Sequence, residues 1–215
     1  MTMRVLIACL LSLLALASHA DTPAARVNGV DIGVLRLERY FSEYLQAQGR
    51  AVASIRNPNL YQRLREQALD ELIDKELLWQ EAKRQGVEIS EAQLTARVGE
   101  VEAAFGSPAV FERRLEEAGF DRRSFADYTR QEMAAQQVYA RLTAVVEPSE
   151  AEVAAFHQAN RQRLQGMQNQ SDNTSVLPEH GLRLARAALV AQLQAQARQA
   201  VRQRLRDSAT VERGD

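Results

Sequence analysis

The side chains that could act in catalysis or hold a metal are few in this sequence. Its three histidines are His19, His157 and His180, and its one cysteine is Cys9. The H-x-x-x-H and Cys spacings of zinc sites do not occur, and neither does a Gly-rich phosphate loop or a G-x-S-x-G nucleophile elbow. We therefore expect ordinary surface histidines, no bound metal and no cofactor.

Carboxylates are plentiful, but their spacing does not predict a catalytic pair. Asp70, Glu71 and Asp74 fall within one segment, and Glu116 and Glu117 are adjacent. A catalytic pair needs two carboxyl groups that converge across a pocket with separated pKa values. Sequence neighbours on a helix point in different directions, so we expect these carboxylates on solvated helix faces. The sequence therefore predicts no catalytic residue.

Large apolar side chains are the remaining candidates, and they favour binding over catalysis. Aromatic residues at helical spacing are more often buried in a core than exposed on a binding surface. A protein that binds apolar ligands nevertheless keeps some of them accessible in a cleft. The candidate binding residues are Phe41, Tyr44, Leu72, Trp79, Phe111, Phe125 and Tyr139.

The elements that would position these side chains are helices, because good helix formers dominate the composition. Residues 60–90 carry two neighbouring apolar stripes at helical spacing, which indicate a helix that buries a wide face. Pro58 suits the first turn of this helix, and Gly86 suits its end. Ser90 and Gln93 then form a capping box for the next helix.

The remaining segments predict further helices and one small β element. Helices are expected over residues 34–48, 90–105, 108–118 and 181–207. Another helix is expected to begin at residue 121 or 124 and to end near residue 145, with an apolar stripe that reaches Val146. Residues 26–32 contain an Asn-Gly turn and are expected to pair with the β-like residues 209–212. The predicted fold class is all-α, mostly helical, with a short two-stranded β element that joins the N- and C-terminal segments.

The first twenty residues have the layout of a secretory signal peptide. Arg4 precedes an apolar run at residues 5–17, which is too short for a comfortable membrane span, and a small-x-small site at residues 18–20. Cleavage after Ala20 would remove Cys9, which excludes disulfides and thiolate chemistry from the exported chain. The formal net charge of −1 does not favour nucleic-acid binding.

Several stretches resemble a known family. The helix at residues 69–82, with the Gly-Val-Glu-Ile-Ser turn at 86–90, is similar to the N-terminal chaperone domain of SurA-like periplasmic proteins, and PrsA-like foldases share a similar pattern. Residues 111–119 follow the family's F-x(3)-L-x(3)-G element, and residues 146–153 resemble its V-x-P-S-x-x-E-V link. The resemblance covers nearly the whole chain after the signal peptide.

The resemblance implies a fold in which a C-terminal helix and strand return to the N-terminal chaperone domain. It also implies a periplasmic, ATP-independent holdase that binds unfolded secreted or outer-membrane proteins. The seven apolar candidates would then be its client-binding residues. The implied partners are unfolded or extended polypeptides, without nucleic acid or stable membrane insertion, and the protein would be a monomer or a helix-swapped dimer.

The expected domain organisation has four parts. They are the signal peptide at residues 1–20, the helical chaperone domain at 21–164, a polar linker at 165–178, and the C-terminal helix and strand at 179–215. In SurA-like relatives a parvulin-type prolyl isomerase module stands at the linker, and nothing in this sequence matches its motifs. A linker of that length is too short for a domain, which usually needs at least about fifty residues. The chain is therefore not expected to be an enzyme.

Two alternatives remain open. One is a member of the prolyl isomerase family with residual activity at an unrecognised site. The other is a dedicated adaptor of an envelope export or assembly system.

Overall fold

The computed structural model describes residues 23–168 and 178–214, which divide into two compact units. The first unit takes the chain up to Ile73 and from Thr210 onward, and the second is Asp74–Ala209. The predicted signal peptide lies outside the described residues, and so does most of the predicted linker.

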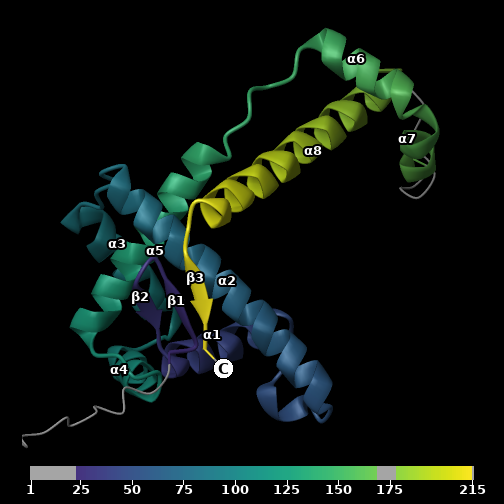
Figure 1. The fold of residues 1–215 in the computed structure, drawn as a ribbon. Coiled ribbons are helices and arrows are strands. Elements are labelled where there is room, and N and C mark those ends of the chain that lie inside the picture. The colour runs from purple at the N-terminus through teal and green to yellow at the C-terminus, as the bar shows by residue number, and fades with distance from the viewer. Residues whose placement is uncertain (1–22, 169–177, 215) are drawn as a thin grey trace, which may run out of the picture. The chain divides into compact units, whose positions relative to one another are not determined.

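Helices make up most of the described residues, so the predicted fold class is confirmed (Figure 1). In chain order the elements are β1 (Ala25–Val27), β2 (Val30–Ile32), α1 (Val34–Ala47), the 3-10 helix η1 (Val52–Ser54), α2 (Pro58–Arg84), α3 (Glu91–Ala104), α4 (Pro108–Glu117), α5 (Arg122–Leu142), α6 (Glu150–Ala159), α7 (Arg161–Gln168), α8 (Pro178–Asp207) and β3 (Val211–Arg213).

The sheet in the first unit joins the two ends of the described chain, as the sequence predicts. Its strand order is β2-β1-β3 and both pairings are antiparallel (Figure 1). It has three strands rather than two, because Asn28 and Gly29 adopt φ values of 50° and 83° and turn β1 back onto β2. Asn28 also donates its N–H to the Thr210 carbonyl and accepts the Thr210 N–H at its side-chain oxygen, both at 2.8 Å.

The helical core of the first unit is built from α1 and the first turns of α2. Phe41 on α1 is fully buried and meets the ring of Tyr61 edge-on, with 5.2 Å between ring centroids. The hydroxyl of Tyr40 donates to the carboxylate of Glu71 at 2.7 Å at the edge of this contact. The buried residues of α1, which are Leu37, Phe41 and Leu45, therefore face inward.

Helix α2 begins and ends where the sequence predicts. Asn57 accepts the Leu60 N–H at its side-chain oxygen, which caps the first turn ahead of Pro58. At the other end Gly86 has a φ of 62°, and the N–H of Val87 returns to the Ala82 carbonyl at 2.9 Å. Both predicted ends of α2 are thus present in the structure.

Helices α3, α4 and α5 pack with the last turns of α2 in the second unit. The buried members of their core are Ala82, Ile89, Leu94, Ala134 and Val138. The structure confirms the predicted capping box at the start of α3. It also shows a capping box at the start of α6 and a Ser107 cap at the start of α4. One boundary prediction is wrong: α5 ends at Leu142, and Val146 is 89% exposed in the extended link to α6 instead of lying on a helical stripe.

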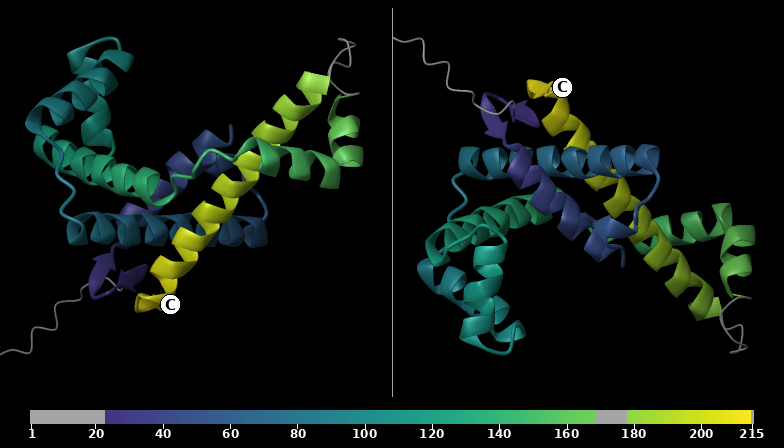
Figure 2. Two further views of the ribbon diagram at one scale, coloured as in Figure 1. Left: turned by 90° about the horizontal axis from the view of Figure 1, so that it is seen from above. Right: turned by 90° about the horizontal axis from the view of Figure 1, so that it is seen from below.

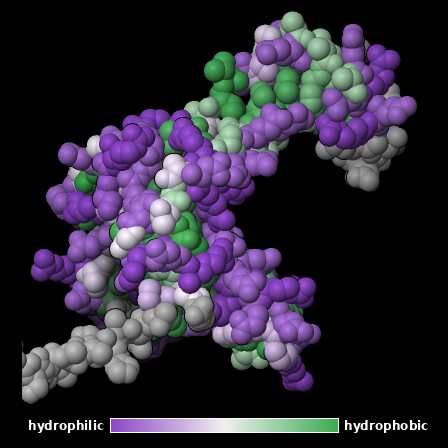
Figure 3. Space-filling model, in the orientation of Figure 1, coloured by the Kyte–Doolittle hydropathy of each residue, from purple (hydrophilic) through white to green (hydrophobic). Residues whose placement is uncertain are grey.

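Helices α6 and α7 pack beside the first turns of α8, as both views in Figure 2 show. Val153, Leu164 and Ala185 form the buried centre of this group. Hydrophobic residues are also visible on its surface in Figure 3. Helix α7 falls partly on residues that the sequence assigns to a linker. Across the described residues no helix has the length and apolar character of a membrane span.

Candidate functional site

The second unit contains a hollow of about 510 Å³ between α2, α3 and α5, which we call the aromatic groove. Its apolar lining comes from Leu78, Val101, Phe125, Tyr128, Met133, Ala135 and Tyr139, and its polar lining from Lys75, Arg97, Thr129, Glu132 and Gln136. Most of the large apolar side chains among these are half-buried, so each presents one face to solvent. The groove therefore offers accessible apolar surface at the edge of a packed core.

Helical spacing explains why these side chains share one surface. On α5 the lining residues recur at intervals of three or four from Phe125 to Tyr139, which places them on one face. Arg97 and Val101 are one turn apart on α3, and Lys75 and Leu78 are one turn apart on α2. Three helix faces thus converge on the groove.

Packing from behind holds the aromatic rings of the groove in place. Phe125 lies edge-on to the buried ring of Phe111, with 5.5 Å between centroids, and Tyr128 lies 5.4 Å from Phe120. An ion pair between Lys75 and Glu132 crosses the groove, and each side chain is 32% exposed. The aromatic rings are therefore held by their neighbours, and the ion pair adds a polar edge to the groove.

A second hollow adjoins the first, and we call it the basic trough. It has a volume of about 680 Å³ and lies between the end of α5, the extended link after it, and α8. Its lining residues are Gln136, Tyr139, Ala140, Thr143, Ala144, Val145, Gln194, Arg198 and Arg202. Gln136 and Tyr139 line both hollows, so the two share a wall on α5.

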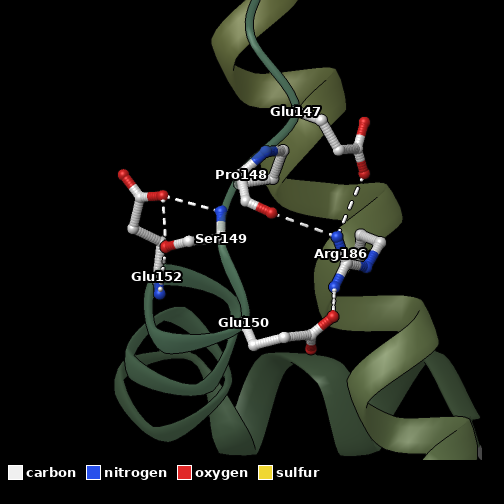
Figure 4. Close-up of polar contacts among 6 residues, drawn as sticks. All are labelled: Glu147, Pro148, Ser149, Glu150, Glu152 and Arg186. Carbon is white, nitrogen blue, oxygen red and sulfur yellow. Dashed lines mark hydrogen bonds and ion pairs between the residues drawn. The ribbon is translucent and has the colours of Figure 1, made fainter.

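Arg186 fastens the link that follows α5 to α8 (Figure 4). Its guanidinium donates to the Glu147 carboxylate and the Pro148 carbonyl, each at 3.1 Å, and it also pairs with Glu150. The bond to Glu147 and the attraction of Glu150 raise the pKa of Arg186 above its usual value. Next to this contact, Ser149 and Glu152 cap α6 reciprocally. The end of the link next to α6 is thus held by the side chain of Arg186 rather than by hydrogen bonds between backbone groups.

One ionic contact attaches the other end of α8 to α2 within the second unit, and a second ion pair lies within α2. Arg206 donates to the Asp74 carboxylate at 2.5 Å. Within α2, the Glu81 side chain is 7% exposed and its two oxygens accept hydrogen bonds from two guanidinium nitrogens of Arg84, each at 2.7 Å. The hydrogen bond from Arg84, helped by Gln85 and by the charge of Arg204, lowers the pKa of Glu81. The Arg206–Asp74 pair therefore anchors the end of α8 that follows Arg202 of the basic trough.

The structure places three of the seven candidate binding residues in the core. Phe41, Leu72 and Phe111 are each at most 3% exposed. Tyr44 is half-buried and donates its hydroxyl to Gln67 at 3.1 Å. In the first unit, Phe41 and Tyr44 therefore contribute to the packing of α1 against α2.

The other three candidates lie in the second unit. Phe125 and Tyr139 both line the aromatic groove. Trp79 is half-buried against the core of α2, α3 and α5, and the Lys83 ammonium lies 5.1 Å from its ring centroid. A role of these residues in binding clients stays a prediction.

Several groove residues are not among the seven binding candidates, chiefly Leu78, Val101, Tyr128 and Met133. Val101 and Tyr128 lie on the apolar stripes of their helices, and hydrophobic periodicity alone does not separate a core position from a groove position. A signal was nevertheless present on α5, because Tyr128 and Met133 extend the spacing from Phe125 toward Tyr139.

The charged candidates take structural positions. The carboxylate of Asp70 pairs with Arg213 at 2.5 Å, and that of Glu117 pairs with Arg114 at 2.7 Å. His157 is half-buried on α6, while the side chain of His180 lies outside the described residues. No three metal-ligating side chains come together in the part of the chain that the structure describes.

Comparison with known proteins points to one group. A family model described as the SurA-like N-terminal domain matches residues 3–139. Among solved structures, the chain is similar to one reported in a study of PEB4 and Cj1289, two structurally related SurA-like chaperones of Campylobacter jejuni. The identity is 11%, the TM-score is 0.52, and the match covers 90% of this chain and 99% of that chain, so the likeness concerns the fold. A comparison with curated proteins gave no match.

Proposed function

This chain belongs to the SurA-like chaperone family, and from that premise we propose that it is a periplasmic, ATP-independent holdase for unfolded secreted or outer-membrane proteins. The observation that carries the proposal is the aromatic groove, whose rings are accessible on one face and packed on the other. Such a surface suits extended polypeptides, which expose apolar side chains that a folded protein buries.

The energetics of the groove are compatible with release without nucleotide. Burying one large apolar client side chain contributes about 1.5–3 kcal/mol. Association costs translational and rotational freedom, so a single anchor binds weakly and several anchors are needed for retention. A client would then leave when it folds, because folding removes its apolar side chains from the groove.

Light scattering of a urea-diluted outer-membrane β-barrel protein tests the proposal. The exported chain at stoichiometric amounts should suppress aggregation. Val101→Glu places a charge in the groove and should weaken suppression, because a carboxylate there has to be desolvated by an apolar client. Leu35→Glu is the matched control, since Leu35 is 79% exposed on α1, outside the groove.

The same measurement separates the proposal from its alternatives. Unchanged aggregation would count against a general holdase and favour a dedicated adaptor, which a pull-down would reveal as one stoichiometric folded partner. A protease-coupled proline isomerisation assay with a rate above background would favour residual isomerase activity. N-terminal sequencing of the exported protein tests our further proposal that cleavage follows Ala20.

A further inference from the structure

Two guanidinium groups on α8 that line the basic trough have no carboxylate partner among the described residues. Arg198 and Arg202 are exposed, lie one helical turn apart, and both line the basic trough. Arg186 and Arg206, on the same helix, do pair with carboxylates. Like charges four residues apart on a helix repel each other, so a bound anion would relieve this repulsion.

The rest of the trough lining suits a carboxylate. Its uncharged polar side chains include Gln136, Tyr139 and Gln194, which can donate hydrogen bonds to an occupant, while the Thr143 hydroxyl already donates to the Tyr139 carbonyl. None of the described residues that line it is acidic. The guanidinium fork matches the geometry of a carboxylate and can bind it through two parallel bonds. Charge complementarity therefore favours an acidic occupant.

The shared wall makes the trough a continuation of the aromatic groove. Gln136 and Tyr139 line both hollows. From Phe125 to Leu142 the α5 helix rises about 25 Å at about 1.5 Å per residue. An extended chain of about eight residues, at about 3.3 Å each, covers the same length. One short extended segment is therefore long enough to reach both hollows.

We propose that the two hollows form one binding path for an extended polypeptide segment that is apolar toward one end and carries Asp or Glu toward the other. The apolar end lies in the aromatic groove, and the carboxylates bind Arg198 and Arg202. This inference rests on the proposed holdase function and adds a charge preference to it. Apolar segments with nearby acidic residues would be held more tightly than equally apolar segments without them.

Fluorescence anisotropy with two labelled decapeptides tests the preference. Both have acetylated and amidated ends and the same Leu and Phe residues in one half, and they differ only in two Asp or two Asn residues in the other half. The wild-type chain should bind the Asp peptide about three- to ten-fold more tightly, as expected for two exposed ion pairs. The preference should shrink as the salt concentration rises from about 0.05 M to about 0.5 M.

Two double variants locate the effect. Arg198→Gln/Arg202→Gln should lose the preference and keep its affinity for the Asn peptide, because Gln preserves the helix and removes the charge. The matched control, Arg63→Gln/Arg183→Gln, removes two exposed arginines outside both hollows and should keep the preference. Thermal unfolding of each variant, followed by circular dichroism, checks that the fold is retained.

The outcomes distinguish the two proposals. Equal affinity of the wild-type chain for both peptides overturns the charge preference but leaves the holdase intact. A preference that survives in Arg198→Gln/Arg202→Gln overturns the assignment to these arginines. If neither peptide binds and aggregation is not suppressed, both the preference and the holdase function are wrong.

Discussion

Replacing Phe111 with alanine tests whether this side chain serves the core or a client-binding surface. Its type and spacing made it a candidate for binding, yet it is 1% exposed in the structure. Its ring lies 5.7 Å from that of Phe105 and 5.5 Å from that of Phe125, and the Arg122 guanidinium covers it at 5.4 Å. The residue therefore supports the groove from behind rather than lining it.

The expected loss of stability follows from this burial. Truncation of a buried Phe to Ala removes the transfer free energy of the ring and leaves a cavity, which together cost about 3–5 kcal/mol. The matched control is Phe105→Ala, because Phe105 is 40% exposed and belongs to the same cluster. Its partial burial and the absence of a closed cavity set an expected loss of about 1–2 kcal/mol.

Urea unfolding followed by the fluorescence of Trp79 measures both losses within the second unit. With a denaturant slope of about 2 kcal/mol per molar, the midpoint should fall by about 1.5–2.5 M in Phe111→Ala and by about 0.5–1 M in Phe105→Ala. Equal midpoints in the two variants would refute the reasoning. So would a Phe111→Ala chain of wild-type stability that no longer suppresses aggregation, since that would assign Phe111 to client contact.

Three further predictions address the charges and the backbone. The pKa of the Glu81 carboxylate is lowered in the folded protein, so the ionised carboxylate stabilises the fold. This stabilisation is complete above the unfolded pKa of about 4.3 and is lost as the pH falls through the folded pKa. Urea unfolding midpoints measured from pH 7 to pH 3 should therefore fall less steeply in Glu81→Gln than in the wild type, and parallel curves would contradict this. Arg186→Gln should speed amide hydrogen exchange over residues 144–153 without changing exchange elsewhere, and unchanged exchange there would show that the link is held by packing alone. Gly29→Ala should lower stability by about 1 kcal/mol, because Gly29 has a φ of +83°. Gly99→Ala should raise stability by about 0.5–1 kcal/mol, because Gly99 lies on a helix with open space around it. Thermal unfolding compares the two variants, and a loss of stability in both would contradict the prediction.

Local signals predicted most of the elements. The Pro58 start and the Gly86 end of α2 appear in the structure, as does the capping box at Ser90. These features succeed because a cap depends on the side chain and backbone of a few consecutive residues. The two misses, the end of α5 and the existence of α7, fall where apolar spacing is weak and packing against other helices decides the conformation.

The binding surface could be predicted only in part. Phe125 and Tyr139 were among the candidates and line the groove, while Phe41 and Phe111 have the same helical spacing and are buried. Periodicity identifies the apolar face of a helix, but it does not say how far a neighbouring helix covers that face. The basic trough was missed altogether, because its arginines and its α5 wall are more than fifty residues apart in the chain.

The sequence by itself determined the helical class, the caps, the turn between β1 and β2, and the family to which the chain belongs. Each of these depends on residues that are close in the chain or on a pattern of residue types. Tertiary structure alone decided which aromatic rings remain accessible, that Lys75 and Glu132 pair across the groove, and that two arginines face a hollow without acidic lining. Accessibility and charge pairing depend on which helix faces meet, and that is a property of packing between distant segments rather than of local spacing.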